Sequence, residues 1–483
     1  MDIKVEGGGG GRIMKILLLS PPTISAIKAV IGATGPPLGL AYLASMVREE
    51  HEVRIVDSLA EDYTYEDVER IVKSYDPDVV GITSTTSMIP DAYAVAEMVK
   101  KHNENAKVVM GGPHVTFLPE RTFRECPYID FIVRGEGEKT FKELIDALEK
   151  GKDPSNIRGL SINMGSKVKN NPPQPLIKDL DAIPLPSYDL LPMNKYEVNG
   201  TRFGTVMTSR GCPFNCVFCS SSLQFGRIWR GHSDSRVIEE LRYLREEYKI
   251  REIEFLDDTF TLNKRRAIRI ARRVVEEGLD ISWSASSRVD LFTDEIAQAM
   301  KKGGCHTIYF GIESGSQRTL NFIGKGITPE QSISAVKKAK KHKLNTLGSF
   351  VIGFPEETKE DVEKTIKFSK KVGVDFAQFT IATPYPGTRL WNYALSKKLI
   401  LTFNWRKYTT LDPVMKLKNF TSQQITRLLW KAYLSFYLRP SYLIKDIISR
   451  RGFIFRRVIP KAIKMAKSAM EVIRNGKNLF NSR

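Results

Sequence analysis

The first third of the chain alternates short, continuous apolar runs with stretches in which apolar residues recur at helical spacing. Each run ends in small or polar residues, and continuous runs of this kind are typical of parallel strands that are buried on both faces. The pattern predicts an α/β domain over residues 14–150, with a doubly wound, Rossmann-like sheet of about five strands that binds ligands beyond their carboxyl ends. The runs are KILLLSPP (15–22), EVRIVDS (52–58), DVVGITS (78–84), AKVVMGGP (106–113) and DFIVRGEGE (130–138).

Two stretches of unusual composition flank this domain. Residues 1–13 include five consecutive glycines, which predict a flexible, disordered extension ahead of a folded domain that begins near Met14. Residues 151–200 are rich in proline, which fixes φ and removes a backbone donor, so no regular helix is expected there. We interpret residues 151–200 as a linker wrapped over the domain that follows.

Three of the five cysteines lie together in RGCPFNCVFC, at Cys212, Cys216 and Cys219. A short apolar run, residues 205–208, and an Arg-Gly turn precede them. We therefore expect the thiols on a loop at the carboxyl end of a strand, where sites lie in barrels of alternating strands and helices. Three thiolates can bind three irons of a cubane 4Fe–4S cluster and leave the fourth iron open to another ligand.

Two other roles for these cysteines fit the sequence less well. A structural zinc site needs a fourth Cys or His at local spacing, and the nearest candidate, His232, lies outside the ten residues after the triplet. A disulfide framework is expected in short secreted chains, and we see no signal peptide ahead of this one. The remaining Cys126 and Cys305 lie far apart in sequence, so a second three-cysteine cluster is not expected.

The CxxxCxxC spacing, with an aromatic residue before the last cysteine, resembles the radical SAM superfamily. The resemblance implies a partial (β/α)6 barrel of the TIM type over residues 201–390. In that family S-adenosylmethionine binds the open iron, and a 5′-deoxyadenosyl radical abstracts hydrogen from an unactivated carbon. Further landmarks follow in order, namely EIEFLDDTF (252–260), WSASSRVD (283–290), IYFGIESGS (308–316) and GSFVIGFPEET (348–358).

The same resemblance implies which residues contact S-adenosylmethionine. EIEFLDDTF stands where the family usually has Gly-Gly-Glu, so its two aspartates are carried over by position alone. The expected contacts are Phe218, Asp257, Asp258, Ser286, Arg288, Glu313 and Gly353.

The loops after the predicted strands of residues 14–150 are rich in glycine and hydroxyl groups. No GxGxxG follows the first strand, which disfavours a nicotinamide cofactor. PPLGLAYLA (36–44), ITSTT (82–86), GGPHVTFLPE (111–120) and GEGE (135–138) together resemble the cobalamin-binding domain found ahead of many radical SAM barrels. The contacts that this resemblance implies are Pro37, Leu38, Gly39, Thr83, Ser84, Gly111, Gly112, His114, Gly135 and Glu136.

One departure bears on how cobalt would be held. The Asp-x-His-x-x-Gly signature that supplies a histidine ligand to cobalt in other cobalamin methyltransferases is absent. We interpret His114 as a loop residue near the corrin rather than as a cobalt ligand. An α/β module that binds no ligand is the alternative for this domain, because a fold does not by itself imply a function.

The composition changes in the C-terminal region, residues 391–483, which is expected to be helical and basic. The chain has a net charge of +19, and residues 427–483 contain 14 Lys and Arg against 2 Asp and Glu. Apolar residues recur at helical spacing beside basic ones in segments 428–438 and 454–473, a pattern typical of helices in a lipid interface. No apolar run is long enough to span a bilayer. Peripheral membrane contact is therefore expected, with packing of these helices on the barrel as the alternative.

These observations favour a cytoplasmic, oxygen-sensitive cobalamin-dependent radical SAM enzyme with a ferredoxin- or flavodoxin-type electron donor. The expected reaction forms a C–C bond at an unactivated carbon of a hydrophobic substrate, with methyl transfer to an isoprenoid or other lipid preferred. Ring formation on a tetraether lipid or a tetrapyrrole shares the same architecture. A non-catalytic cobalamin- or cluster-binding sensor with a nucleic-acid-binding tail is the alternative of another class, although no RNA-binding module is recognisable and no nucleic-acid partner is expected.

Overall fold

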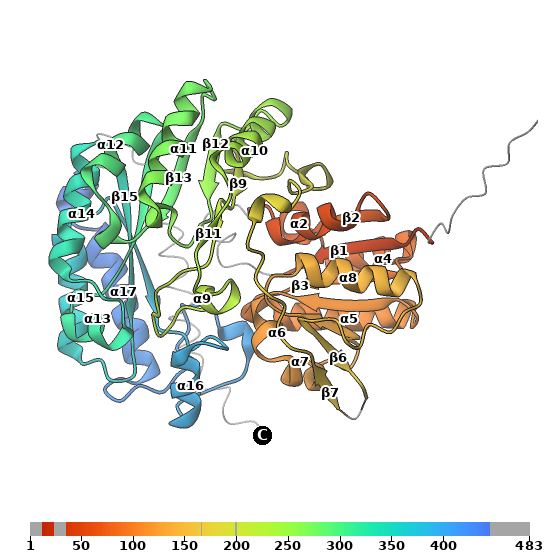
Figure 1. Cartoon of the computed structure of the whole chain (residues 1–483). Helices are drawn as coiled ribbons and strands as arrows, with labels where there is room; N and C mark the ends of the chain where they lie inside the picture. The colour runs from red at the N-terminus through yellow and green to blue at the C-terminus, as the bar shows by residue number, and fades with distance from the viewer. Residues whose placement is uncertain (1–11, 24–34, 166, 199, 445–483) are drawn as a thin grey trace, which may run out of the picture. The chain divides into compact units, whose positions relative to one another are not determined.

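The computed structural model describes residues 12–23, 35–165, 167–198 and 200–444 (Figure 1). The chain divides into two compact units. Within the described residues, the first unit holds residues up to 197 together with 223–233, and the second holds 198–222 and residues from 234 onward. Residues 151–197, which we interpreted as a linker, group with the first unit.

A seven-stranded sheet in the order β2-β1-β3-β4-β5-β6-β7 forms the centre of the first unit. The five predicted strands are its parallel part, which confirms the doubly wound fold. Two further strands, from the proline-rich segment, extend it in antiparallel fashion. The strands are β1 (Lys15–Ser20), β2 (Glu52–Asp57), β3 (Val79–Thr83), β4 (Lys107–Gly111), β5 (Phe131–Val133), β6 (Leu160–Asn163) and β7 (Val168–Asn170).

Helices of the first unit pack in pairs against this sheet, α2 with α8 and α4 with α5. Residues 16–19 of β1 are fully buried, as expected for a central strand covered on both faces. Besides β6 and β7, the described part of residues 151–200 contains a two-residue strand, β8 (Glu197–Val198), and the short 3-10 turns η2 (Leu180–Ala182) and η3 (Tyr188–Leu190). The helices are α2 (Leu38–Val47), α3 (Ser58–Glu61), α4 (Tyr65–Tyr75), α5 (Ile89–His102), α6 (Pro113–Phe117), α7 (Pro119–Glu125) and α8 (Glu138–Glu149).

The other large sheet has seven strands in the order β16-β15-β14-β13-β12-β9-β8. The six strands of this sheet from β9 to β16 are parallel and form the half-barrel of the second unit, with helices on its outer side (Figure 1, green to blue). This confirms the predicted partial (β/α)6 barrel. Its strands are β9 (Thr201–Val206), β12 (Glu252–Phe255), β13 (Ser282–Ser287), β14 (Cys305–Glu313), β15 (Asn345–Ile352) and β16 (Phe376–Ile381). Its helices are α10 (Asp234–Glu247), α11 (Lys264–Glu276), α12 (Asp294–Lys302), α13 (Gln317–Ile323), α14 (Pro329–Lys341), α15 (Lys359–Lys371), α16 (Arg389–Ser396) and α17 (Ser422–Tyr437).

Local sequence explains where several of these helices begin. In a capping box, a Thr side chain accepts from the backbone N–H three residues on, and the side chain at that position accepts from the N–H of the Thr. This arrangement fixes the first turn before any tertiary contact forms. Capping boxes start α4 (Thr64 and Asp67), α14 (Thr328 and Gln331), α15 (Thr358 and Asp361) and α17 (Thr421 and Gln424).

Helix α17 lies along β16, the strand at the edge of the half-barrel. The Tyr437 hydroxyl accepts from the Ala377 N–H at 3.1 Å and donates to the Ala377 carbonyl at 2.8 Å. The Tyr433 hydroxyl does the same for Phe379, at 3.1 and 2.8 Å. Tyrosines four residues apart on a helix thus match alternate residues of β16, and they satisfy backbone groups that an edge strand leaves without a neighbour.

Replacing both Tyr433 and Tyr437 with phenylalanine is expected to destabilise the second unit by about 2–6 kcal/mol. Each change leaves one N–H and one C=O of β16 unsatisfied while keeping the aromatic ring, at about 1–3 kcal/mol per site. Urea unfolding, with light scattering to detect pairing through the exposed edge, measures the effect. Tyr393→Phe is the control, because the Tyr393 hydroxyl is 3.5 Å from an exposed Glu356 carboxylate. Equal stability of the double variant and the control would contradict the assignment.

The described part of the C-terminal region is only partly helical. Segment 428–438 lies largely in α17, which buries Ile425, Leu429, Ala432 and Phe436, so for this segment the structure shows the packed alternative. Residues 397–420, between α16 and α17, are irregular apart from a 3-10 turn, η6 (Trp405–Lys407), and one bridge. Segment 454–473 and residues 1–11 fall outside the described residues. In the described ranges, no helix is long and apolar enough to cross a membrane.

Candidate active site

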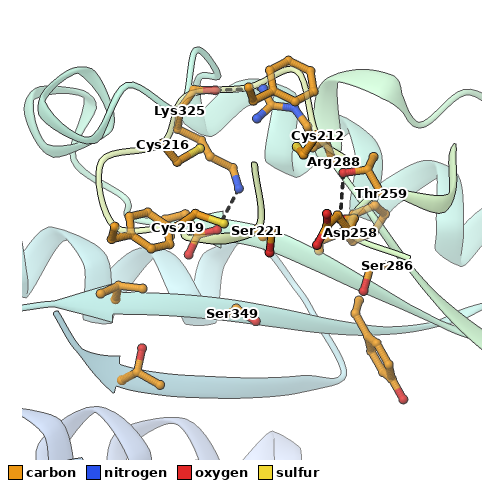
Figure 2. A pocket seen from close by; sticks show the side chains of 18 of the residues that line it. Cys212, Cys216, Cys219, Ser221, Asp258, Thr259, Ser286, Arg288, Lys325 and Ser349 are labelled. Atoms are coloured by element: carbon orange, nitrogen blue, oxygen red, sulfur yellow. Dashed lines mark hydrogen bonds and ion pairs between the residues drawn. The ribbon is translucent and has the colours of Figure 1, made fainter. Parts of the chain in front are cut away.

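A cavity of about 530 Å³ lies at the carboxyl ends of the half-barrel strands, within the second unit. It brings together the cysteine loop, the ends of β12, β13, β14, β15 and β16, and the irregular segment after α16. Figure 2 shows the three cysteines on one loop, with Ser286 of β13 and Ser349 of β15 below them. Of the residues expected to contact S-adenosylmethionine, six line the cavity: Phe218, Asp257, Asp258, Ser286, Arg288 and Glu313.

The cysteine loop follows β9, as the sequence predicts. Cys212, Cys216 and Cys219 are each half-buried and all line the cavity. The loop is held by backbone bonds from Cys219 N–H to the Cys216 carbonyl at 3.2 Å and from Val217 N–H to the Ile323 carbonyl at 2.9 Å. Among the lining residues there is no fourth cysteine and no histidine. The donor set therefore fits a cluster with three protein thiolates and one open iron.

Burial raises the pKa of the Cys212 and Cys216 thiols above the ordinary value. Iron binds the thiolate, so loading a cluster here releases protons. Cys126 and Cys305 are buried elsewhere, Cys126 in the first unit and Cys305 at the start of β14, and neither lines the cavity.

Arg288 connects the cysteine loop to the segment after β14. Its guanidinium lies 3.5 Å from the centroid of the Phe214 ring, between the first two cysteines. It also donates to both carboxylate oxygens of Asp290, at 3.0 and 2.9 Å, and to the Lys325 carbonyl at 2.8 Å. These contacts hold the loop against two neighbouring elements of the barrel.

Glu313 ends β14 with a φ of 64°, a left-handed backbone conformation that is uncommon for a residue with a side chain. Its carboxylate forms a buried ion pair with Lys325 at 2.8 Å. Gly311 makes room for that pair, because a Cβ there would lie 2.5 Å from Glu313 Oε1 and 2.7 Å from Lys325 Nζ. Lys325 also lines the cavity, where Figure 2 draws it near Cys216. Sequence reasoning missed Lys325, because no local motif marks a partner twelve residues away.

Asp257 braces the base of the cysteine loop. Its carboxylate accepts from the Thr208 N–H and hydroxyl at 2.7 Å each and from the Ser209 hydroxyl at 2.5 Å. Arg266 of α11 donates to the Thr208 hydroxyl at 3.1 Å and to its carbonyl at 2.8 Å. Asp257 was expected to contact S-adenosylmethionine; it lines the cavity while its oxygens accept hydrogen bonds within the protein, and the contact stays a prediction. Asp258, the next residue, is exposed to the cavity and keeps the expected role as a prediction.

Gly353 does not line the cavity, which corrects the expectation that it contacts S-adenosylmethionine. It has a φ of 84°, and the positions nearest a Cβ there belong to Ile425 and Leu417 of the C-terminal region. Its N–H donates to the buried Glu357 carboxylate at 2.6 Å. Burial raises the pKa of Glu357 to about 7. Ser349 and Val351, on the strand β15 that precedes Gly353, line the cavity.

In the first unit, the expected cobalamin contacts gather at the carboxyl edge of the parallel strands. Thr83 ends β3 and pairs in register with Gly111, which ends β4. Gly112 has a φ of 102°, and a Cβ there would lie 2.4 Å from the Ser84 carbonyl oxygen. Pro37, Leu38 and Gly39 begin α2, and a Cβ at Gly39 would meet open space.

This edge fits a large planar cofactor. The strand order 2-1-3-4-5 reverses direction between β1 and β3, and doubly wound sheets bind ligands at such a point. The buried Ser84 hydroxyl has no hydrogen-bond partner among the residues that the structure describes. Small residues leave this edge of the sheet unobstructed, and the Ser84 hydroxyl is available to hydrogen-bond a cofactor bound there.

Two expected cobalamin contacts occupy other surroundings. His114 lies not in a loop but in the short helix α6, fully buried, and burial lowers its pKa to about 4. Glu136 is buried with Arg230, which donates to its two oxygens at 2.8 and 2.9 Å, and it accepts from the Ile177 N–H. Gly135 has a φ of 74° and donates to the Thr116 hydroxyl at 3.1 Å.

Comparison with known proteins agrees with this division. Residues 24–145 match the family described as the B12 binding domain, and residues 206–369 match the radical SAM superfamily. The chain is 69% identical to the uncharacterized methyltransferase PH0819 of Pyrococcus horikoshii over 448 residues, which cover 93% of this chain and 98% of that protein.

More distant relatives include enzymes of known reaction. The anaerobic magnesium-protoporphyrin IX monomethyl ester cyclase of Rubrivivax gelatinosus is 28% identical, covering 89% of this chain and 78% of the cyclase. The solved structure of the cobalamin-dependent S-adenosylmethionine radical enzyme OxsB, with aqua-cobalamin and S-adenosylmethionine bound, has a similar fold. Its TM-score is 0.74 at 20% identity, covering 96% of this chain and 71% of that one. The protein therefore belongs to the cobalamin-dependent radical SAM methyltransferase family, whose cofactors are cobalamin, S-adenosylmethionine and a 4Fe–4S cluster.

Proposed function

We propose that the protein forms a C–C bond by transferring a methyl group to an unactivated carbon of a hydrophobic substrate, an isoprenoid or another lipid. The observation that carries the proposal is the apolar part of the cavity wall beside the three thiols. Apolar walls bind hydrocarbon by removing it from water, and they exclude water from the reacting centre. The apolar lining residues are Phe214, Phe218, Leu256, Phe310, Val351, Ile381 and Ala382.

In this proposal each unit binds a different cofactor. Cys212, Cys216 and Cys219 would hold the cluster, and the edge formed by Thr83, Ser84 and Gly112 would hold cobalamin. When bound, the cofactors supply a carbon-centred radical that removes hydrogen from an unactivated carbon, together with a methyl group. The described side chains keep the cavity dry and orient the substrate carbon. The 69% identical relative, described as a methyltransferase, supports transfer of a methyl group.

Radical ring formation on a tetraether lipid or a tetrapyrrole is the second candidate. The similarity to a protoporphyrin ester cyclase over 89% of the chain favours it. The two reactions differ in what they consume. Methyl transfer uses S-adenosylmethionine as a methyl donor and therefore releases S-adenosylhomocysteine in addition to 5′-deoxyadenosine. Ring closure releases 5′-deoxyadenosine but no S-adenosylhomocysteine.

The test is an anaerobic assay with the full chain, reconstituted cluster and cobalamin, a reductant, lipid extract and S-adenosylmethionine with a trideuterated methyl group. We expect S-adenosylhomocysteine to accumulate together with 5′-deoxyadenosine, and the labelled methyl group to appear by mass spectrometry in a lipid. Formation of 5′-deoxyadenosine with an unlabelled lipid that has lost hydrogen would support ring closure instead. Label found only in water-soluble compounds would contradict the hydrophobic substrate class.

Two partners belong to the same proposal. A ferredoxin- or flavodoxin-type protein would reduce the cluster. The outer side of α17 and the residues after it would touch a membrane surface, since Leu434 of α17 and the following Leu438 and Ile444 are exposed by 42%, 44% and 59%. Interfacial helices combine such apolar positions with basic residues. Loss of liposome binding on removal of residues after about 425 would be the expected result, and unchanged partitioning would contradict it.

A further inference from the structure

We infer that the inward face of the half-barrel, at the level of Glu254, binds the polar end of the substrate and selects a hydrogen-bond donor, neutral or cationic, over an anion. Glu254 is the specificity-determining residue in this inference. The inference rests on the proposed function for the apolar part of the substrate. It adds the chemistry of the group at the other end.

The geometry of β12 places Glu254 on the inward face. Side chains alternate along the strand, with Ile253 and Phe255 buried at 0% and 1% exposure and Leu256 lining the cavity. Glu254 therefore lies on the same face as Leu256, two residues before it in the chain and further from the cysteine loop. Its register partner on β13 is Ser284. The register places Glu254 inside the half-barrel rather than under the outer helices.

The next strand continues this polar layer. Tyr309 of β14 lines the cavity, and its hydroxyl donates to the Ser284 hydroxyl at 3.2 Å. Burial raises the pKa of the Tyr309 hydroxyl, and the charge of Glu254 adds to this effect. Glu254, Ser284 and Tyr309 thus form a polar layer across three adjacent strands, in which Ser284 is the register partner of Glu254 and is hydrogen-bonded to Tyr309.

Glu254 differs from two other carboxylates of the half-barrel, Glu313 and Glu252, in having no partner within the described ranges. Glu313 is paired with Lys325, and Glu252, two residues earlier on the same face, lies 2.6 Å from His306. Among the described residues, Glu254 has neither a hydrogen bond nor an ion pair. Burial removes water from a carboxylate, and the loss of hydration is unfavourable when no protein donor replaces the water. A ligand that donates a hydrogen bond to this carboxylate would offset the unfavourable desolvation.

Gln378 faces the same space from the other side of the half-barrel. It lies on β16, lines the cavity, is exposed, and has no hydrogen-bond partner in the described part of the chain. β12 and β16 are separated by three strands of a curved sheet, so in this inference the ligand extends across the half-barrel from Glu254 toward Gln378. A hydroxyl or ammonium group satisfies Glu254 and the amide oxygen of Gln378. A phosphate or carboxylate group would face Glu254 with a like charge.

The experiment measures binding rather than turnover. Isothermal titration under anaerobic conditions uses the full-length protein loaded with its cofactors and three probes of equal chain length: octan-1-ol, octylamine and octyl phosphate. We expect the alcohol and the amine to bind more tightly than the phosphate by about tenfold or more. Glu254→Gln is expected to remove the preference for the amine. Glu252→Gln, two residues earlier on the same face, is the matched control and is expected to keep it.

Equal affinity for the three probes, or tighter binding of octyl phosphate by the wild-type protein, would overturn the inference whatever the variants do. An amine preference that Glu254→Gln leaves unchanged, with a normal melting curve, would also overturn it. Ethylamine separates this inference from the proposed function. Binding of ethylamine as tight as that of octylamine, and dependent on Glu254, would keep the inference and contradict the hydrophobic substrate. Binding of all three octyl probes without a head-group preference would agree with a hydrophobic substrate and contradict the inference about Glu254.

Discussion

Cys216→Ala is expected to abolish assembly of the cluster and to reduce 5′-deoxyadenosine formation to the background without enzyme. Two remaining thiolates cannot hold a cubane that needs three protein ligands. The loop itself should persist, because backbone bonds at Val217 and Cys219 hold it independently of the thiols. Iron content, the visible absorption of the reconstituted protein and product formation with S-adenosylmethionine and reductant provide the measurements.

Cys126→Ala is the matched control, since Cys126 is buried in the first unit and does not line the cavity. It should keep about four irons per chain, as a cubane requires. Retained iron and retained cleavage in Cys216→Ala would remove this cysteine from the ligand set. Equal loss in both variants would point to damage to the fold rather than to a ligand.

Asp257→Ala is expected to lower the free energy of unfolding by about 3–5 kcal/mol, because it leaves buried donors and a buried cation without their anion. The Thr208 N–H, the Thr208 hydroxyl and the Ser209 hydroxyl would all lose their acceptor, while Arg266 stays buried at 4% exposure. Since this network anchors the residues just before Cys212, iron retention should fall together with stability. Urea unfolding and iron analysis after reconstitution measure the two effects.

The neighbouring Asp258→Ala provides the comparison, because Asp258 is exposed in the cavity and braces no strand end. Its expected effect on stability is below about 1 kcal/mol, as for most exposed positions. Similar stability of the two variants would show that the hydrogen bonds to Asp257 contribute little to the fold. Lower stability for Asp258→Ala would reverse the roles assigned to the two aspartates.

Much of the fold was predictable from hydrophobic pattern. The runs at 15–22, 52–58, 78–84, 106–113 and 130–138 became β1 to β5, since continuous apolar strands between helices can be buried only in a parallel sheet covered on both faces. The two antiparallel strands β6 and β7 were missed. They are short, polar and set among prolines, so their pairing depends on a sheet edge that is built by distant residues.

Within the site, prediction succeeded where chemistry is encoded locally and failed where it depends on a partner. The spacing of the three cysteines is enough to predict a cluster site, and the three cysteines do line one cavity. Asp257 and Glu313 were assigned to the cofactor because each stands in a polar motif after a strand. Both residues line the cavity, where Asp257 also accepts from Thr208 and Ser209 and Glu313 pairs with Lys325, so their contact with the cofactor stays a prediction. Gly353 belongs to the contact with the C-terminal region.

Hydrophobic periodicity and short spacings, which act over a few residues, were enough to predict the two cofactor domains and the cysteine loop. Which carboxylates already have partners, and which do not, became evident only from the folded chain. The pairing depends on donors from other parts of the chain, such as Lys325 for Glu313, and on their absence around Glu254 among the described residues. The folded chain also shows that tyrosines of α17 satisfy the edge of β16. Hydrogen bonds and ion pairs join residues that are close in space, and a single sequence does not record that proximity.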